Sequence, residues 1–455
     1  MRIRGATVYT PQGPVEADVR VDMGTIIAVG DEASTGEDPE EIDGGGLWLL
    51  PGAVDAHVHS RDPGLPEKED FRSLTAAAAA GGVTTVVDMP NTIPAVDTDE
   101  VFWEKAADVA QRASVDFALW GVVRSSAAEA DLRGLAVAGA VGIKAYLGYA
   151  LRRENRQITY TLDLGDPGLE APPDYGTLAR CAPLLAELGL PLAVHAEDPG
   201  ILREFARPAD SYAEVLASRP ALAEAVAVAA LDRIARATGC TVHIVHLSSR
   251  AGLDAAWQAL AASSPMILET CSQYLWCTDE DVERIGPWGK MYPPIRTADD
   301  RDALREGLRE GVIDRVATDH APHEDAEKSG RSWGEAAAGS PGVQTLYISC
   351  LELARRWGDP ALAVRWVAEA PARSLRIWPR KGGIQVGADA DLVLVDPRAE
   401  TRMEPRMMRS RQVHGLFEGQ TFPFRVRAVW SRGRLVARDG EPLPASGHGR
   451  LVRPA

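Results

Sequence analysis

Hydrophobic and polar positions follow one pattern at the two ends of the chain and another in its middle. The N-terminal end contains the segments RIRGATVYT, EADVRVD and TIIAVG, and the C-terminal end contains ADLVLVD and RVRAVWSRGRLVARDG. Short segments in which apolar and polar residues alternate are typical of half-buried strands. We therefore expect residues 1–50 and 376–455 to form one composite β-sandwich domain.

The middle of the chain, residues 51–375, alternates apolar strand-like runs with alanine-rich segments of helical length. The candidate strands are LWLLPGAVDAHVH, VTTVVDM, VDFALWGVV, VGIKAYL, LPLAVHAED, TVHIVHLSS, MILETC and IDRVATDHAPH. Eight such strands separated by helices predict an α/β fold, a (β/α)8 TIM-like barrel. An open doubly wound sheet is the alternative, but its Gly-x-Gly-x-x-Gly turn follows none of these strands.

Polar side chains stand at the ends of several of these apolar runs. His57 and His59 end the first strand, and because residues i and i+2 of a strand point the same way, both imidazoles would face one point. The carboxyl ends of barrel strands meet at one mouth, where catalytic side chains gather. Five strands would bring six candidate metal ligands to this mouth: His57, His59, Lys144, His195, His246 and Asp319.

The composition of this ligand set favours zinc. Four imidazoles and a carboxylate suit Zn²⁺ or a similar cation, whereas Mg²⁺ and Ca²⁺ favour oxygen ligands. Lys144 fits only in a changed form, because an ammonium has no lone pair and repels a metal ion. Burial and nearby cations would lower its pKa and free the amine, which can add carbon dioxide to give an anionic, bridging carbamate. The alternative is a lysine paired with an acid at the barrel rim.

Charge and cysteine content narrow the class of protein. The chain has 49 Lys+Arg against 65 Asp+Glu and a net charge of −16, which argues against a broad nucleic-acid surface. Its five cysteines include no Cys-x-x-Cys pair, and no apolar stretch has the length of a signal peptide or membrane span. We expect a cytoplasmic protein without a disulfide framework, with neither nucleic acid nor membrane as partner.

A series of motifs makes the chain similar to a known family. They are PGAVDAHVHSRDPG, AAAAAGGVTTVVDMPNTIP, GIKAYLG, LPLAVHAED, VHIVHLSS, ETCSQYL, PPIR and ATDHAPH, in family order, and GADADLVLVD in the flanking domain. On these residues the chain resembles the amidohydrolase superfamily, in the cyclic amidase branch that holds dihydroorotases, allantoinases and hydantoinases.

The resemblance implies a barrel with a binuclear zinc centre at its mouth. The two Zn²⁺ ions would be held by side chains at the strand ends: His57, His59 and Asp319 at the more buried ion, His195 and His246 at the other, and carboxylated Lys144 between them. It further implies that Asp319 acts as general base and then acid while a ring amide opens, and that the protein is a homo-oligomer, a dimer or tetramer. His243 lies an odd number of residues from His246, so we expect it to face elsewhere.

The substrate expected first is dihydroorotate. Dihydroorotases hold a ring carboxylate with three side chains that this sequence has at Arg61, Asn91 and His323. A guanidinium fork matches a carboxylate in two hydrogen bonds. The resemblance therefore predicts a dihydroorotase, which interconverts dihydroorotate and N-carbamoyl-aspartate in pyrimidine biosynthesis.

Other residues keep a different small cyclic amide or ureide open as substrate. Tyr292 stands where dihydroorotases commonly show asparagine, CSQYL resembles the hydantoinase version, and SWGEAAAGSPGVQ resembles that of allantoinases. The alternative is an allantoinase or a hydantoinase/dihydropyrimidinase-like amidase. A non-catalytic scaffold homologue ranks below both, because it would lack metal ligands that are all present here. The polar segment EDAEKSGRSWGEAAAG after His323 is expected to be a mobile loop near the mouth.

Overall fold

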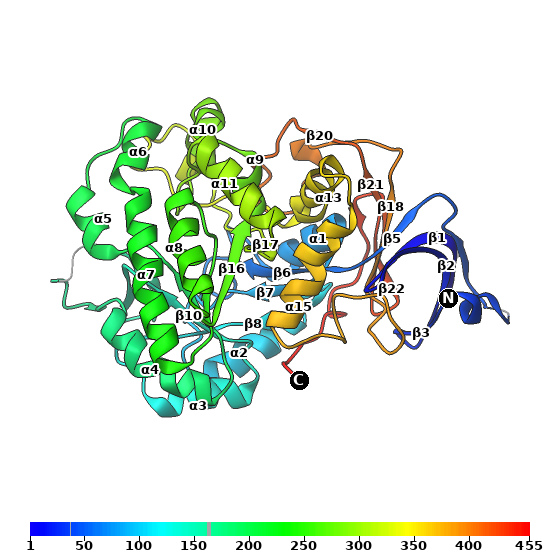
Figure 1. Cartoon of the computed structure of the whole chain (residues 1–455), viewed down its shortest axis with the longest axis horizontal. Helices are drawn as coiled ribbons and strands as arrows, with labels where there is room; N and C mark the ends of the chain where they lie inside the picture. The colour runs from blue at the N-terminus through cyan, green and yellow to red at the C-terminus, as the bar shows by residue number, and fades with distance from the viewer. Residues whose placement is uncertain (37, 162–164) are drawn as a thin grey trace.

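The computed structural model, which describes residues 1–36, 38–161 and 165–455, places a barrel beside a β domain made from both ends of the chain (Figure 1). One nine-stranded sheet forms the β domain, in the order β23-β22-β21-β18-β5-β1-β2-β3 with β4 paired to β1. Its N-terminal strands are β1 (Arg2–Thr10), β2 (Gly13–Asp22), β3 (Thr25–Val29), β4 (Glu41–Asp43) and β5 (Trp48–Pro51). Its C-terminal strands are β18 (Leu392–Asp396), β21 (Arg425–Ser431), β22 (Arg434–Arg438) and β23 (Glu441–Pro442). The composite domain is confirmed, and its two halves join where β5 and β18 pair antiparallel.

The barrel consists of parallel strands that correspond one to one to the predicted apolar runs. They are β6 (Ala53–Val58), β7 (Val83–Asp88), β8 (Asp116–Leu119) continued by β9 (Gly121–Val122), β10 (Ile143–Tyr146), β14 (Leu192–His195), β15 (Val242–Ile244), β16 (Met266–Cys271) and β17 (Arg315–Ala317). The ring closes between its last and first strands, where the His59 amide donates to the His320 carbonyl at 2.7 Å. The (β/α)8 prediction is therefore confirmed.

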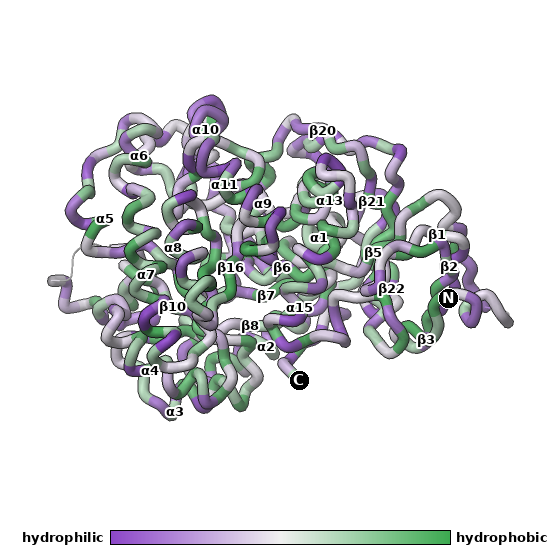
Figure 2. Tube along the Cα trace, viewed as in Figure 1, coloured by the Kyte–Doolittle hydropathy of each residue, from purple (hydrophilic) through white to green (hydrophobic). Residues whose placement is uncertain are grey.

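Helices surround the barrel and follow the strands in alternation, as Figure 1 shows for α4, α7 and α8. The main helices are α1 (Phe71–Gly81), α2 (Asp99–Ala110), α3 (Glu129–Ala138), α4 (Tyr175–Glu187), α7 (Ala221–Thr238), α8 (Arg250–Ala261), α11 (Ala298–Arg309) and α13 (Leu346–Arg356). Shorter helices are α5 (Pro199–Phe205), α6 (Tyr212–Ser218), α9 (Ser272–Trp276), α10 (Asp279–Ile285), α12 (Asp325–Lys328), α14 (Ala361–Val364) and α15 (Ala370–Ser374). Figure 2 shows hydrophobic residues along β16 and hydrophilic ones on the outer helix α10.

Local sequence explains where α1 begins and ends. The Asp70 side chain accepts from the Ser73 amide and the Ser73 hydroxyl bonds back, which satisfies donors that a helix start leaves free. At the other end Gly82 adopts a left-handed φ of 85°, a conformation that costs glycine little. The predicted alanine-rich helix with a glycine stop is thus present, and it lies directly before β7.

The first apolar run is divided between the two domains at a glycine. The sequence suggested one buried strand from residue 47 to the histidines, but β5 belongs to the β domain and β6 to the barrel. A Cβ on Gly52 would lie 2.0 Å from the Thr84 hydroxyl oxygen, so only glycine fits at this passage. Apolar composition alone does not reveal such a break, because both strands are buried.

Three smaller features complete the fold. A separate antiparallel sheet stands next to the barrel mouth and contains β11 (Tyr149–Arg152), β12 (Ile158–Tyr160) and β13 (Leu169–Glu170). Strands β19 (Thr401–Arg402) and β20 (Thr421–Phe422) pair with each other. The C-terminal tail returns to the barrel, where the Val452 amide donates to the Phe117 carbonyl at 2.7 Å.

A buried ion network joins the barrel to the β domain. The Lys381 ammonium is fully buried and lies 2.6 Å from Asp116 at the start of β8 and 2.7 Å from Asp391 beside β18. Asp389 adds a third carboxylate at 2.9 Å, and Arg432 also binds Asp116 at 3.0 Å. Burial alone would lower the pKa of Lys381, but these carboxylates raise it above its usual range. The lysine is therefore charged and holds the two domains together.

Replacing Lys381 by methionine is expected to destabilise the protein strongly. The substitution leaves Asp116 and Asp391 buried without their shared cation, and breaking such a pair costs about 3–5 kcal/mol. The measurement is the midpoint of thermal or urea unfolding. Arg380→Gln is the control, because it removes an exposed partner of Asp389 and should move the midpoint little. Equal midpoints for Lys381→Met and Arg380→Gln would contradict this role.

Candidate active site

The six predicted metal ligands meet at the carboxyl ends of five barrel strands. His57 is in β6 and His59 directly follows it, Lys144 is in β10, and His195 ends β14. His246 and Asp319 each lie two residues beyond a strand, after β15 and β17. All six line one cavity of about 260 Å³, together with Arg61, Asn91 and His323. The predicted convergence at the barrel mouth is thus what the structure has.

Two groups of ligand atoms form within this cavity. Asp319 Oδ1 lies 3.3 Å from His57 Nε2 and 3.0 Å from His59 Nε2, and these three residues could hold a metal ion. Beside them, His195 Nδ1 and His246 Nε2 are 2.9 Å apart. Lys144 lines the same cavity, and its ammonium is one of the causes that lower the pKa values of His57, His195 and His246. The candidate ligand atoms thus fall into two neighbouring groups.

The protonation states of these groups suit a borderline divalent cation. Burial and the nearby Lys144 lower the pKa of His57 to about 4, so its imidazole is neutral and has a free lone pair. Burial alone would raise the pKa of Asp319, but the adjacent histidines lower it to about 2. Neutral imidazoles with an ionised carboxylate are a zinc-type donor set.

Lys144 is the least satisfied residue of the site. Its side chain is fully buried, and its Nζ has no hydrogen-bond partner among the described residues. Burial lowers the pKa of Lys144 to about 8, while Asp319 and Glu269 act in the opposite direction. Burying an amine without a hydrogen-bond partner costs free energy of folding. The presence of Lys144 in this position therefore indicates a role in chemistry or ion binding. His246 Nδ1 is likewise buried without a partner among the described residues.

Three residues of the site have a left-handed backbone. The φ angles are 60° at Arg61, 42° at His246 and 48° at Asp319. Such a conformation at a residue other than glycine costs on the order of 1–3 kcal/mol and clusters at functional sites. In each case it occurs just past the end of a strand, where the chain must turn the side chain into the mouth.

Carboxylate and amide groups behind the ligands fix the orientation of three imidazoles. Glu269 Oε1 lies 3.1 Å from His57 Nδ1, Glu197 Oε2 lies 3.0 Å from His195 Nε2, and Asn91 Oδ1 lies 2.6 Å from His59 Nδ1. Such partners select the tautomer and ring position of a metal-binding histidine. The sequence analysis did not identify either glutamate. Each is an acidic residue within an apolar run, LAVHAED or MILETC, and this position could have indicated a role in the site. Asn91 was predicted to bind substrate, and its side-chain oxygen contacts the His59 ring.

Arg61 and His323 lie against each other on one wall of the cavity, with Arg61 Nη2 3.2 Å from His323 Nε2. His323 is also engaged by the Ala338 carbonyl at 3.0 Å and by Glu327 at 3.2 Å. Burial lowers the pKa of His323 to about 3, so the ring is neutral. No carboxylate of the described residues lies within ion-pair distance of Arg61, which leaves its charge directed at the cavity.

Another part of the cavity wall is aromatic, and the sequence analysis identified only Tyr292 in it. Tyr146, Tyr149, Tyr160 and Tyr292 line the cavity. Their rings follow one another, at 5.6 Å from Tyr146 to Tyr149, 5.2 Å from Tyr149 to Tyr160 and 6.1 Å from Tyr160 to Tyr292. Tyr149 also meets His195 edge-on at 5.3 Å. Flat aromatic faces of this kind suit a small planar ring.

Two further expectations concern residues near the mouth. His243 is buried outside the cavity wall, as expected, and lies 3.2 Å from Glu269. The loop after His323 is anchored: the buried Lys328 donates to the Lys290 carbonyl at 3.0 Å, and Lys290 donates to the Gly334 carbonyl at 3.1 Å. This segment therefore reaches the cavity as a packed wall, through Ala338 and Gly339.

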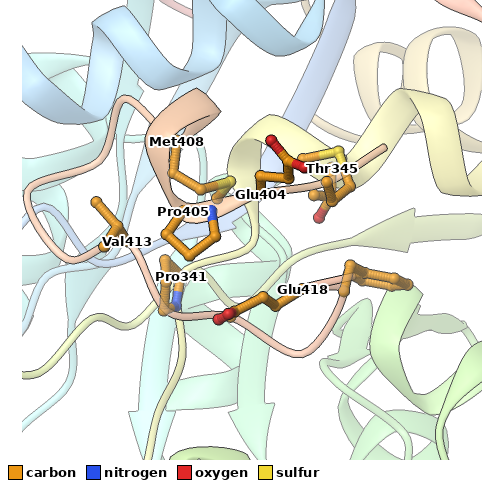
Figure 3. A pocket seen from close by; sticks show the side chains of 10 residues that line it. Pro341, Thr345, Glu404, Pro405, Met408, Val413 and Glu418 are labelled. Atoms are coloured by element: carbon orange, nitrogen blue, oxygen red, sulfur yellow. The ribbon is translucent and has the colours of Figure 1, made fainter. Parts of the chain in front are cut away.

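A second hollow lies behind this wall, between Pro341, Thr345, Glu404 and Met408 (Figure 3). Its volume is about 10 Å³, enough for about one water molecule. It is too small to be a substrate site.

None of the described helices has both the length and the apolar character needed to cross a membrane.

Comparison with known proteins agrees with this geometry. A family model described as "Amidohydrolase family" matches residues 48–436. Allantoinase of Bacillus velezensis is 34% identical over 100% of this chain and 97% of its own, and dihydroorotase of Halobacterium salinarum is 35% identical over 93% and 95%. The solved structure of L-hydantoinase from Arthrobacter aurescens superposes with a TM-score of 0.91 at 30% identity, covering 99% of both chains.

Proposed function

The chain belongs to the amidohydrolase family and is a hydrolase of cyclic amides, and we propose that its substrate is a neutral cyclic ureide of the allantoin or hydantoin kind. One observation carries this choice. His323, one of the three side chains that dihydroorotate would need, is already engaged at both ring nitrogens, Nδ1 by Glu327 and Nε2 by the Ala338 carbonyl. The remaining wall is aromatic and suits a planar, uncharged ring.

This proposal replaces dihydroorotate, the substrate expected first from the sequence, by its alternative. Two allantoinases and an L-hydantoinase match 99–100% of the chain, and two dihydroorotases match 93% and 92% of it. Tyr292 supports the same choice, because it places a ring where the sequence expectation needed an asparagine amide.

Dihydroorotate stays the second candidate because of Arg61. The Arg61 guanidinium lines the cavity without an acidic partner among the described residues, and a substrate carboxylate would satisfy it. The two candidates thus differ in one property, the negative charge on the ring, and in one residue that would sense it.

The family is metal-dependent, and we place two zinc ions on the six converging side chains. When bound, such ions supply hydroxide at neutral pH and polarise the amide carbonyl that it attacks. The ionised Asp319 carboxylate lies at the centre of the ligand cluster, so it accepts the proton of the attacking water and returns it to the leaving nitrogen. The tyrosine wall holds the ring flat against this centre and excludes bulk water.

Lys144 is proposed to act as a carbamate. Its neutral amine attacks carbon dioxide, a nitrogen–carbon bond forms and one proton leaves to solvent. The product is an anionic group with two oxygens, which suits a position between two cations. The burial of Lys144 and its lack of a hydrogen-bond partner among the described residues support this assignment.

A side-by-side assay of allantoin, hydantoin and dihydroorotate tests the substrate class. We expect kcat/KM for a neutral ureide to exceed that for dihydroorotate. Arg61→Ala should lower any dihydroorotate activity by on the order of 100-fold, since a buried arginine–carboxylate pair is strong, and change the ureide reaction far less. Arg112→Ala is the control, because it removes a neighbouring arginine that binds Asp62 outside the cavity. Fastest turnover of dihydroorotate, lost in Arg61→Ala, would refute the proposal.

A further inference from the structure

Arg219 lies behind the cavity, at the end of α6, and its side chain contacts both halves of the site. It is 3% exposed and outside the set of residues that line the cavity. No motif of the sequence draws attention to it, since SRP reads as a turn between α6 and α7. Its position follows from packing between α6 and the chain that leaves β14.

Towards the metal centre, Arg219 holds Glu197. Its Nε donates to Glu197 Oε1 at 3.2 Å and its Nη2 donates to Oε2. The same Oε2 lies 3.0 Å from His195 Nε2. One oxygen atom therefore receives both the arginine and the ligand histidine.

Towards the substrate, the same guanidinium supports the aromatic wall. Its central carbon lies 3.8 Å from the centroid of the Tyr292 ring and 5.0 Å from that of Tyr160. Both tyrosines line the cavity. A planar cation stacked on a ring fixes the position of that ring, and lysine cannot reproduce the contact because its charge is a compact point.

We propose that Arg219 is a positioning residue that couples the two halves of the site. Through Glu197 it sets the ring of His195, and through Tyr292 it sets the surface on which the substrate lies. If Arg219 acted only by its charge, the ion pair with Glu197 would be enough. If it served only the stability of the fold, it would need neither the Glu197 oxygen that His195 also contacts nor the stacking on the Tyr292 ring. The inference rests on the proposed function in taking His195 as a metal ligand.

Arg219→Gln and Arg219→Lys test the coupling. In metal-depleted protein titrated with Zn²⁺, Arg219→Gln should bind one of the two ions about 10–100-fold more weakly. In the reloaded enzyme, its KM for the ureide should rise about tenfold, as expected when a stacked cation is lost. Arg219→Lys keeps a charge beside Glu197, so it should retain zinc better than Arg219→Gln while its KM rises equally.

Three matched variants separate the two contacts and the stability of the chain. Glu197→Gln should weaken zinc binding alone, and Tyr292→Leu should raise KM alone. Arg432→Gln removes another buried arginine–carboxylate pair, formed with Asp116 at the start of β8 and outside the cavity, and should lower thermal stability alone. Zinc affinity and KM of Arg219→Gln both within twofold of wild type would overturn the proposal. If no ring substrate is hydrolysed, the proposed function fails and the zinc titration still decides the inference.

Discussion

Replacing Lys144 by alanine is expected to remove nearly all activity and at least one of the two metal ions. The substitution deletes the cavity-lining side chain that we propose to lie between the two ligand groups. Losing several kcal/mol of metal-derived stabilisation corresponds to a fall in kcat of about 1,000-fold or more. Metal content is measured by mass spectrometry of the purified protein, and ring opening by loss of substrate absorbance.

The carbamate assignment adds a second expectation for Lys144→Ala. Acetate or propionate should enter the space left by the side chain and restore part of the activity in a saturable way, because each supplies the missing carboxylate oxygens. In the wild type, growth of a carbamate signal in the ¹³C spectrum under labelled carbon dioxide reports the modification directly. Wild-type metal content together with more than a tenth of the activity in Lys144→Ala would contradict the assignment.

Lys144 and Lys381 make a matched pair of buried lysines with opposite expected effects. Lys381 contacts three carboxylates, and Lys144 has no hydrogen-bond partner among the described residues. Lys381→Met should therefore lower stability and leave metal content unchanged. Lys144→Ala should cost metal and activity, yet leave the metal-free protein as stable as the wild type or more so, since it removes an uncompensated buried amine.

Replacing Asp319 by asparagine is expected to reduce kcat by about 10²–10⁴-fold, the usual contribution of a general base. Asparagine has the same shape and keeps one oxygen towards His57 and His59, so most of the metal should remain. It cannot accept the proton of the attacking water, because its nitrogen lone pair is delocalised. The measurement is kcat at saturating ureide, beside metal content of the same preparation.

A control for Asp319→Asn is available beyond the end of another barrel strand, β14. Asp198→Asn exchanges a carboxylate that caps α5 and lies outside the cavity. Asparagine caps helices as well as aspartate does, so activity should stay close to wild type. Full metal content with more than a tenth of wild-type kcat in Asp319→Asn would exclude the general-base role. Complete loss of metal would reduce Asp319 to a ligand.

Local sequence patterns were sufficient to predict the barrel and the convergence of the six candidate ligands at its mouth. Each apolar run contains one barrel strand, and polar residues at its far end reached the mouth because parallel strands all finish on one side. His57 and His59 illustrate this: their rings are 5.3 Å apart, although His59 lies just beyond the end of β6. Their two-residue spacing brings the rings together whatever the distant chain does.

Contacts between distant segments decided the substrate side of the site. Arg61 and His323 are 262 positions apart, and their mutual contact depends on the loop that Lys328 anchors. Asn91 was expected to hold substrate; it lines the cavity, and its amide oxygen also contacts His59, which its place in a motif did not indicate. The tyrosine wall likewise comes from β10, the small β11–β12 sheet and the segment near Tyr292.

By itself the sequence determined which residues lie at strand ends, and so the barrel, the six donors and the type of cation that suits them. Only the tertiary structure decided which candidate ligands are held in place from behind, by Glu269, Glu197 and Arg219. It also decided which candidate substrate-binding residues already have hydrogen-bond partners in the protein. The physical reason is the separation along the chain over which each feature is determined. Periodicity encodes the face on which a residue of its own strand or helix lies, whereas a hydrogen bond between distant segments depends on how whole elements pack.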